Sequence, residues 1–206
     1  MSREDYAARY GLDAGKTWIT LMPGSRMKEV RMNLPAILES AAKLGLGYEF
    51  LLPVAPTLNR SWLGDLISDR IPVKLVPEAL PALAHSRAGI IASGTATLEA
   101  ALMETPFVMV YRVSPLTYLL GRSRVKVPHF AIVNLIAGKE VVPELVQQDF
   151  TADNVVSKLS TILPDGPVRD KMIQNLATVR TALAGPNLDA LLPADRAAEI
   201  IRTLLT

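Results

Sequence analysis

The chain contains no cysteine among its 206 residues, which excludes disulfide bonds, thiolate-bound zinc and a thiol nucleophile. Its two histidines, His85 and His129, are too few for a metal site built from several histidines of one chain. The formal net charge is only +2, so binding of nucleic acid through bulk charge is not expected. No apolar run reaches the roughly 20 residues that a membrane-spanning helix needs, and the polar opening residues Met1–Tyr6 do not resemble a signal peptide.

Half of the residues are hydrophobic, which is sufficient for a globular core. Apolar runs rich in Val, Ile and Leu alternate with segments of helical length. Such runs predict strands that are covered on both faces, and the alternation predicts a parallel sheet with right-handed crossovers. We therefore predict an α/β fold, a Rossmann-like parallel sheet flanked by helices. The expected strands are Thr17–Met22, Tyr48–Pro53, Val73–Val76, Gly89–Ala92, Phe107–Tyr111 and Ala131–Asn134.

The remaining segments predict helices. Pro35 interrupts the first long segment, so we expect a short helix there, followed by a longer one that Asn33 caps. From Glu144 onward the chain is expected to be all-helical. We predict a core domain over residues 1–150 and C-terminal helices over 151–206 that pack on it or on a partner lobe. The expected helices are Glu4–Gly11, Met27–Lys43, Leu58–Ser68, Glu78–His85, Thr95–Met103, Pro143–Gln148, Ala152–Leu163, Pro167–Ala184 and Ala194–Leu205.

Two glycine turns follow expected strands. One contains Gly24 and Ser25, and the other runs from Ser93 through Gly94. In parallel sheets ligands bind beyond the carboxyl ends of the strands, and free backbone N–H groups at such turns bind phosphate. Two such turns predict a nucleotide site, and Glu99 just beyond the second is suited to holding ribose hydroxyls.

Arg26 and Glu99 each have two interpretations. Arg26 lies at an expected helix start, where the dipole disfavours a cation by about 0.3–1 kcal/mol. Either an anionic ligand or a salt bridge to Glu29 could compensate. Glu99 is not a capping-box acid, because Ala96 stands where Ser or Thr is required. It either binds a ligand or lies on a solvated helix face.

Two further segments have functional and structural interpretations. Asn134–Glu140 is a polar loop between an expected strand and an expected helix, and such loops often carry function. Pro115–Leu120 is an apolar segment whose basic end extends to Lys126. It suits either an anionic lipid surface or a partner subunit, or else it is a core helix with a solvated end. We expect a structural role for His85.

Four segments occur together in one order: Pro23–Val30, Ala92–Glu99, Tyr111–Arg112 and Asn134–Leu145. This set resembles the lipid-A-disaccharide synthase family from about Glu4 to the C-terminus, and it covers only the C-terminal half of that family. The resemblance implies one lobe of the two-lobed GT-B architecture. The N-terminal domain, which binds the acceptor and carries acidic catalytic residues, is then expected to be missing here.

The resemblance also implies an activity. The whole enzyme would be an inverting, metal-independent glycosyltransferase without a cofactor. It would move diacylglucosamine from UDP-2,3-diacylglucosamine onto 2,3-diacylglucosamine 1-phosphate and release UDP, at the cytoplasmic face of the inner membrane of Gram-negative bacteria. Its final helices would cross over within a chain or into a partner chain, so a homodimer is one expected arrangement.

The resemblance further assigns roles to residues. Glu99 would hold the ribose, while Ser93, Gly94, Thr95 and Ala96 would contact the diphosphate. Gly24 and Ser25 would also bind the substrate. Arg26 would stabilise the leaving diphosphate in place of a metal. Tyr111 and Arg112 would line the pocket near the base. Asn134, Lys139 and Glu140 match the third motif, with Lys139 where arginine is usual.

Other function classes are compatible with the same residues. One is another GT-B protein, either a UDP-GlcNAc transferase or a UDP-GlcNAc 2-epimerase, which should lack the segment Asn134–Leu145. The other is a nucleotide-binding or membrane-docking module without catalysis. Comparing acylated with unacylated UDP-sugars, and testing for activity with the other half added, would separate these alternatives.

Overall fold

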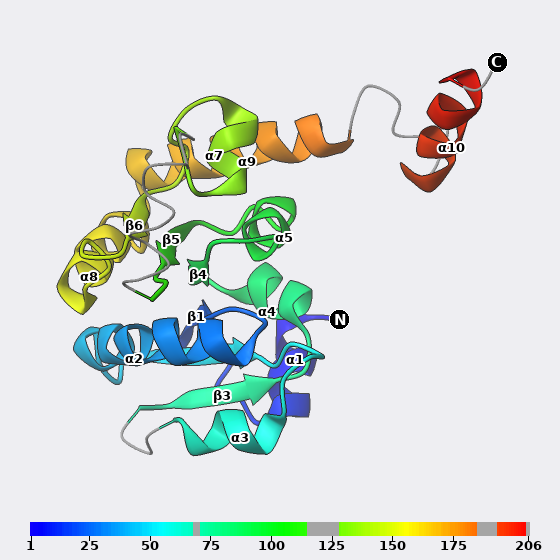
Figure 1. Ribbon diagram of the computed structural model, residues 1–206. Coiled ribbons are helices and arrows are strands. Elements are labelled where there is room, and N and C mark those ends of the chain that lie inside the picture. Colours follow the sequence, from blue (N-terminus) through cyan, green and yellow to red (C-terminus); the bar gives the residue numbers. More distant parts are fainter. Residues whose placement is uncertain (68–70, 115–127, 185–192, 205–206) are drawn as a thin grey trace.

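The computed structural model describes residues 1–67, 71–114, 128–184 and 193–204 (Figure 1). Within these residues a six-stranded parallel sheet has the order β3-β2-β1-β4-β5-β6. This confirms the predicted Rossmann-like sheet. The strands are β1 (Thr17–Met22), β2 (Tyr48–Pro53), β3 (Val73–Val76), β4 (Ala88–Ala92), β5 (Phe107–Tyr111) and β6 (Glu144–Val146).

Helices cover both faces of the sheet. Helices α2 and α8 pack against each other, and α8 contacts β4 and β5, while α4, α5, α7 and α9 form a second contiguous set. Right-handed crossovers produce this division, because the connections on the two sides of β1 run in opposite directions. The helices are α1 (Arg3–Tyr10), α2 (Met27–Leu44), α3 (Arg60–Asp65), α4 (Ala79–His85), α5 (Ala96–Leu102), α7 (Ile132–Ala137), α8 (Ala152–Ile162), α9 (Pro167–Ala184) and α10 (Pro193–Leu204).

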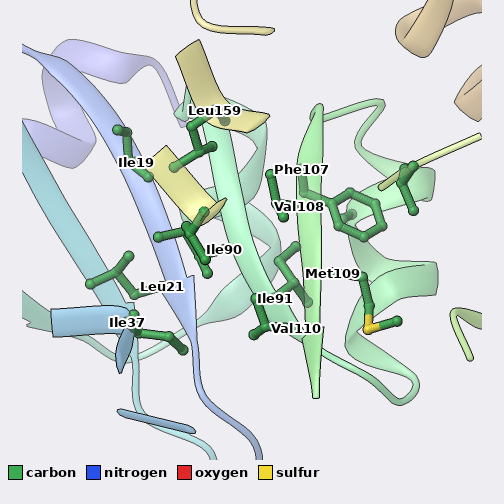
Figure 2. Packing of buried hydrophobic residues seen from close by; sticks show 14 of the residues in the cluster. Ile19, Leu21, Ile37, Ile90, Ile91, Phe107, Val108, Met109, Val110 and Leu159 are labelled. Atoms are coloured by element: carbon green, nitrogen blue, oxygen red, sulfur yellow. The ribbon is translucent and has the colours of Figure 1, made fainter. Parts of the chain in front are cut away.

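The main core lies between the sheet and its helices (Figure 2). Ile19 and Leu21 of β1, Ile90 of β4 and Leu159 of α8 are fully buried in it, together with Ile37 of α2. Continuous apolar strands therefore serve both faces, as the composition of the runs predicted.

A smaller buried cluster joins α1 to residues of β1, β2, β3 and α4. Trp18 and Tyr6 are buried there, and the Arg3 guanidinium lies 3.6 Å from the centroid of the Trp18 ring. Arg3 also donates hydrogen bonds to the backbone carbonyls of His85 and Lys16. His85 ends α4 with its ring 5.7 Å from that of Tyr6, which agrees with the structural role expected for it.

Two expected elements have the wrong type. The segment Ala131–Asn134 was expected as a strand, but residues Ile132–Ala137 form α7, which ends at Gly138 with φ 64°. Asn134 is thus on a helix and not in a loop. The segment Pro143–Gln148 was expected as a helix, but it contains β6, which pairs with β5. The C-terminal part is therefore not all-helical from Glu144 onward.

The first long helix is continuous through Pro35, so the expected break is wrong. Asn33 does not cap a helix, because its buried amide donates to the carbonyl of Pro23 and accepts from the backbone N–H of Arg112. The side chains of Val30, Leu34 and Ile37 are buried around the proline. Their burial offsets the roughly 3 kcal/mol that an interior proline costs.

The predicted boundary between residues 150 and 151 stays a prediction. Leu159 of α8 and Leu176 of α9 are buried in the main core cluster, whereas α10, red in Figure 1, stands apart from it. The apolar segment Pro115–Leu120 and its basic end lie outside the described residues. No helix of the described ranges is long and apolar enough to cross a membrane.

Candidate functional site

A cavity of about 850 Å³ lies beyond the carboxyl ends of β1 to β4. Its position follows from the strand order, because β1 and β4 are neighbours whose following connections lead in opposite directions. Such a switch point is where doubly wound sheets bind ligands. The cavity is lined by Met22, Gly24, Ser25, Arg26, Glu29, Pro53, Val54, Ala55, Pro56, Pro77, Glu78, Ala79, Leu80, Pro81, Ala92, Ser93, Gly94, Thr95, Ala96, Glu99, Leu102 and Ile132. We call it the switch-point cleft.

The first glycine turn connects β1 to α2 and is folded around the Glu29 side chain. Gly24 has φ 124°, and a Cβ atom there would lie 2.6 Å from the Glu29 Cβ. The Glu29 carboxylate accepts from the backbone N–H groups of Ser25 and Arg26, at 3.0 and 3.3 Å. A glycine is therefore required here by both the backbone conformation and the space.

Arg26 forms the salt bridge that one of its two interpretations expects, and its role toward an anionic ligand stays a prediction. Its Nη1 donates to Glu29 Oε1 at 2.8 Å, so the salt bridge is formed. Its side chain is nevertheless 81% exposed and lines the cleft. Because a guanidinium has five N–H donors and an exposed pair of this kind contributes little to stability, Arg26 retains the capacity to bind an anion.

The second glycine turn, Ser93–Ala96, connects β4 to α5. Gly94 has φ 145° with open space around its missing Cβ, so the conformation alone requires glycine there. None of the described residues accepts a hydrogen bond from the backbone N–H groups of Gly94, Thr95 or Ala96. Adjacent unpaired N–H groups form a concave site suited to an anion.

Glu99 lies beside this turn on α5, and its half-buried side chain lines the cleft. No described residue forms a hydrogen bond or ion pair with its carboxylate. Burial raises the pKa of the Glu99 carboxyl above its usual value. Among the described residues the Glu99 carboxylate thus has no donor partner, and it can accept hydrogen bonds from hydroxyl groups in the cleft.

Five residues to which the resemblance assigned ligand contacts do not line the cleft. The Arg112 guanidinium donates to the carbonyl of Phe150 and lies 4.7 Å from the centroid of its ring. Tyr111 ends β5 and accepts at its carbonyl from the N–H of Gln147. Asn134 is fully buried, whereas Lys139 and Glu140 are exposed beyond α7.

Several cleft residues were not predicted. Val54–Pro56 follow β2 and Pro77–Pro81 follow β3. Both segments end predicted strands of one parallel sheet, so their position could have been inferred from the same rule that located the glycine turns. Leu80 and Leu102 add apolar surface and are 43% and 40% exposed.

The fold and the cleft together define the class, a lobe of the GT-B glycosyltransferase architecture. A spinosyn forosaminyltransferase superposes with TM-score 0.57 at 15% identity, over 93% of this chain and 44% of that one. A UDP-GlcNAc 2-epimerase from Neisseria meningitidis, bound to UDP-GlcNAc, superposes with TM-score 0.58 at 15% identity, over 98% of this chain and 48% of that one.

The chain belongs to the lipid-A-disaccharide synthetase family, whose model matches residues 2–203. Lipid-A-disaccharide synthase of Koribacter versatilis is 51% identical over 184 residues, covering 88% of this chain and 48% of the relative. That of Acidobacterium capsulatum is 44% identical over 206 residues, covering 93% and 52%. The family resemblance is thereby confirmed, and the chain spans about half the length of these curated relatives.

Proposed function

We propose that this chain is the donor-binding lobe of a lipid-A-disaccharide synthase and that it binds UDP-2,3-diacylglucosamine in the switch-point cleft. The observation that carries the proposal is the Glu99 carboxylate beside the N–H groups of Gly94–Ala96, none of which has a hydrogen-bond partner among the described residues. A carboxylate can accept from two ribose hydroxyls, and the turn can donate to a diphosphate. Family membership supports the substrate class.

In the complete enzyme the transfer would proceed as follows. A general base from the other half of the enzyme deprotonates the acceptor hydroxyl of 2,3-diacylglucosamine 1-phosphate. The oxygen attacks the anomeric carbon with inversion, and the bond to the UDP oxygen breaks. Arg26 stabilises the charge on the leaving diphosphate without a metal. An Arg26→Ala variant of the complete enzyme should therefore lose mainly kcat.

Calorimetric titration with UDP tests the donor site. We expect UDP binding to weaken by about 1–3 kcal/mol in Glu99→Gln, because one of two accepting oxygens is replaced by a donor. Glu104→Gln is the matched control, since this carboxylate pairs with Arg180 outside the cleft. Equal UDP binding by Glu99→Gln and wild type would move the ribose elsewhere, and no binding by wild type would contradict the proposal.

The same titration separates the proposed donor from the alternatives. UDP-2,3-diacylglucosamine should compete with UDP more strongly than UDP-GlcNAc does, because the cleft carries apolar surface at Leu80 and Leu102. Stronger competition by UDP-GlcNAc would favour a UDP-GlcNAc transferase or epimerase.

We further propose that the enzyme works at the cytoplasmic face of the inner membrane. Co-sedimentation of the complete enzyme with anionic vesicles tests its association with a membrane surface.

A further inference from the structure

The Asn134 side chain is buried outside the cleft, and all of its hydrogen-bonding capacity is used within the protein. Its Nδ2 donates to Glu144 Oε1 at 2.7 Å and to the carbonyl of Val142 at 2.9 Å. Its Oδ1 accepts from the N–H groups of Val141 and Val142, at 2.8 and 3.0 Å. An amide has two donors and two acceptor sites, so Asn134 has no capacity left for a ligand.

Glu144, at the start of β6, extends this arrangement to the segment before α7. Its Oε2 accepts from the N–H of Phe130 at 2.8 Å, and its Oε1 accepts from the N–H of Ala131 at 3.0 Å. His129 Nδ1 lies 3.7 Å from Oε1. Charge-assisted bonds to two successive N–H groups hold the backbone of this segment against β6. We call Asn134 and Glu144 together the bracket.

The segment that the bracket holds contacts the cleft. The carbonyl of Phe130 accepts a hydrogen bond from Ser93 Oγ at 2.8 Å, and Ser93 opens the second glycine turn. Ile132, in the first turn of α7, also lines the cleft. A continuous series of hydrogen bonds thus leads from buried Asn134 through Glu144 and Phe130 to the cleft.

We propose that Asn134 and Glu144 are positioning residues for the nucleotide site: they fix Phe130, and Phe130 fixes Ser93 and the conformation of the turn. The inference rests on the proposed function for the identity of the ligand, but the mechanical link belongs to the free protein. It gives the third family motif a role in binding without contact between Asn134 and the ligand.

The link is tested first without ligand, by the backbone amide resonances of the free 206-residue chain. Glu144→Gln keeps the shape but must set an NH2 group against one of the N–H donors. We expect this variant to shift the amide resonances of Gly94 and Thr95. Ser93→Ala should reciprocally shift the amide resonances of Phe130 and Ala131. In the Ser93→Ala background, adding Glu144→Gln should then change the Gly94 and Thr95 resonances only slightly.

Matched controls distinguish the link from general loosening. Glu49 is also buried and accepts from a backbone N–H, that of Asp13 at 2.8 Å, away from the cleft. Glu49→Gln should leave the Gly94 and Thr95 resonances unchanged. Ser160→Ala removes a hydroxyl that donates to a backbone carbonyl on α8 and should leave Phe130 unchanged. If Glu144→Gln does not fold, the reciprocal effect of Ser93→Ala decides alone.

Affinity for UDP provides the functional measurement. We expect Glu144→Gln to weaken UDP binding about tenfold, and much less in the Ser93→Ala background, because the two variants break one series of bonds. The proposal would be overturned if the losses of UDP affinity in the two variants simply multiply. It would also be overturned if Glu144→Gln leaves the amide resonances of Gly94 and Thr95 unchanged. If wild type binds no UDP, the proposed function fails, while the amide resonances still decide the link.

Discussion

At the scale of single residues, charge in the switch-point cleft is unevenly balanced. Glu29 pairs with Arg26 and two backbone N–H groups, whereas Glu99 has no partner among the described residues. Burying a charged carboxylate without a hydrogen-bond or ion-pair partner lowers the free energy of unfolding. The charged form of Glu99 therefore destabilises the folded state. Sites that serve a ligand often trade stability for function in this way.

This imbalance predicts how stability depends on pH. Burial raises the pKa of folded Glu99, so its contribution to stability is complete below the unfolded pKa and is lost as pH rises through the folded pKa. Glu99→Gln should therefore be more stable than wild type at neutral pH, and the difference should shrink toward about pH 4. Urea unfolding at both pH values measures this.

The expected gain is opposite in sign to the loss of UDP affinity in the same variant. Glu104→Gln again serves as the control, because it breaks an ion pair with Arg180 and should gain no stability at neutral pH. A Glu99→Gln protein that is less stable than wild type at neutral pH would show that the carboxylate has a structural partner.

At the scale of elements, apolar continuity predicted the five longer strands of the sheet nearly to the residue. It failed where tertiary contacts decide. β6 has three residues, Glu144–Val146, and it is a strand only because β5 offers its edge. α7 contains the β-branched residues Ile132 and Val133, yet the bracket at Asn134 and the Gly138 cap close it as a helix.

In the cleft too, local sequence predicted some features, whereas tertiary contacts decided others. The glycine turns follow strands directly, and Glu99 lies in the helix that the second turn opens, so local sequence located them. Arg112 and Asn134 belong to matching motifs, but the contact of Arg112 depends on Phe150, which is distant in sequence. The contact of Asn134 with Glu144 depends on the pairing of β6 with β5, which local sequence did not predict. A motif shows that residues belong together and does not show which of them touches the ligand, because bracing and contact both require polar side chains.

The last helix carries a prediction about association. Ile200, Ile201 and Leu204 of α10 are 63%, 58% and 81% exposed, and spacings of three and four place residues on one helix face. We expect this face to pair with a second copy of this chain. Sedimentation equilibrium should show a dimer that Ile200→Ser/Leu204→Ser reduces to monomer.

A matched pair of changes outside that face provides the control. Asp195→Ser/Arg202→Ser alters exposed positions on the opposite side of the same helix and should leave the association unchanged. If the 206-residue chain sediments as a monomer at all concentrations, pairing with a second copy is contradicted.

At the scale of the whole molecule, the described part of the chain presents the switch-point cleft and no group of three or more metal-ligating side chains. We expect these 206 residues to bind UDP but to catalyse no disaccharide formation alone, since the base for the acceptor is proposed to lie in the other half. Adding that half, in a fused or separate chain, should restore transfer.

A radiolabelled-donor assay with and without EDTA measures both parts of this prediction. Activity of the joined halves should be insensitive to the chelator, because Arg26 takes the role of a cation at the leaving group. Disaccharide formation by the 206 residues alone would refute the incomplete-enzyme interpretation. Loss of activity with EDTA, restored by a divalent cation, would refute metal independence.

The adjacency of β1 and β4 has a consequence for folding. Leu21 of β1 pairs with Ile90 of β4. The segment between these two strands contains β2 and β3, so it forms a long loop that must close before β1 and β4 can pair. Such long-range pairing is slow to form, because loop closure precedes the contacts that reward it. The two glycine turns are therefore brought together only when the sheet's centre is complete. A nascent chain that has made only one half of the sheet has no cleft, so recovery of nucleotide binding during refolding should report the last cooperative step.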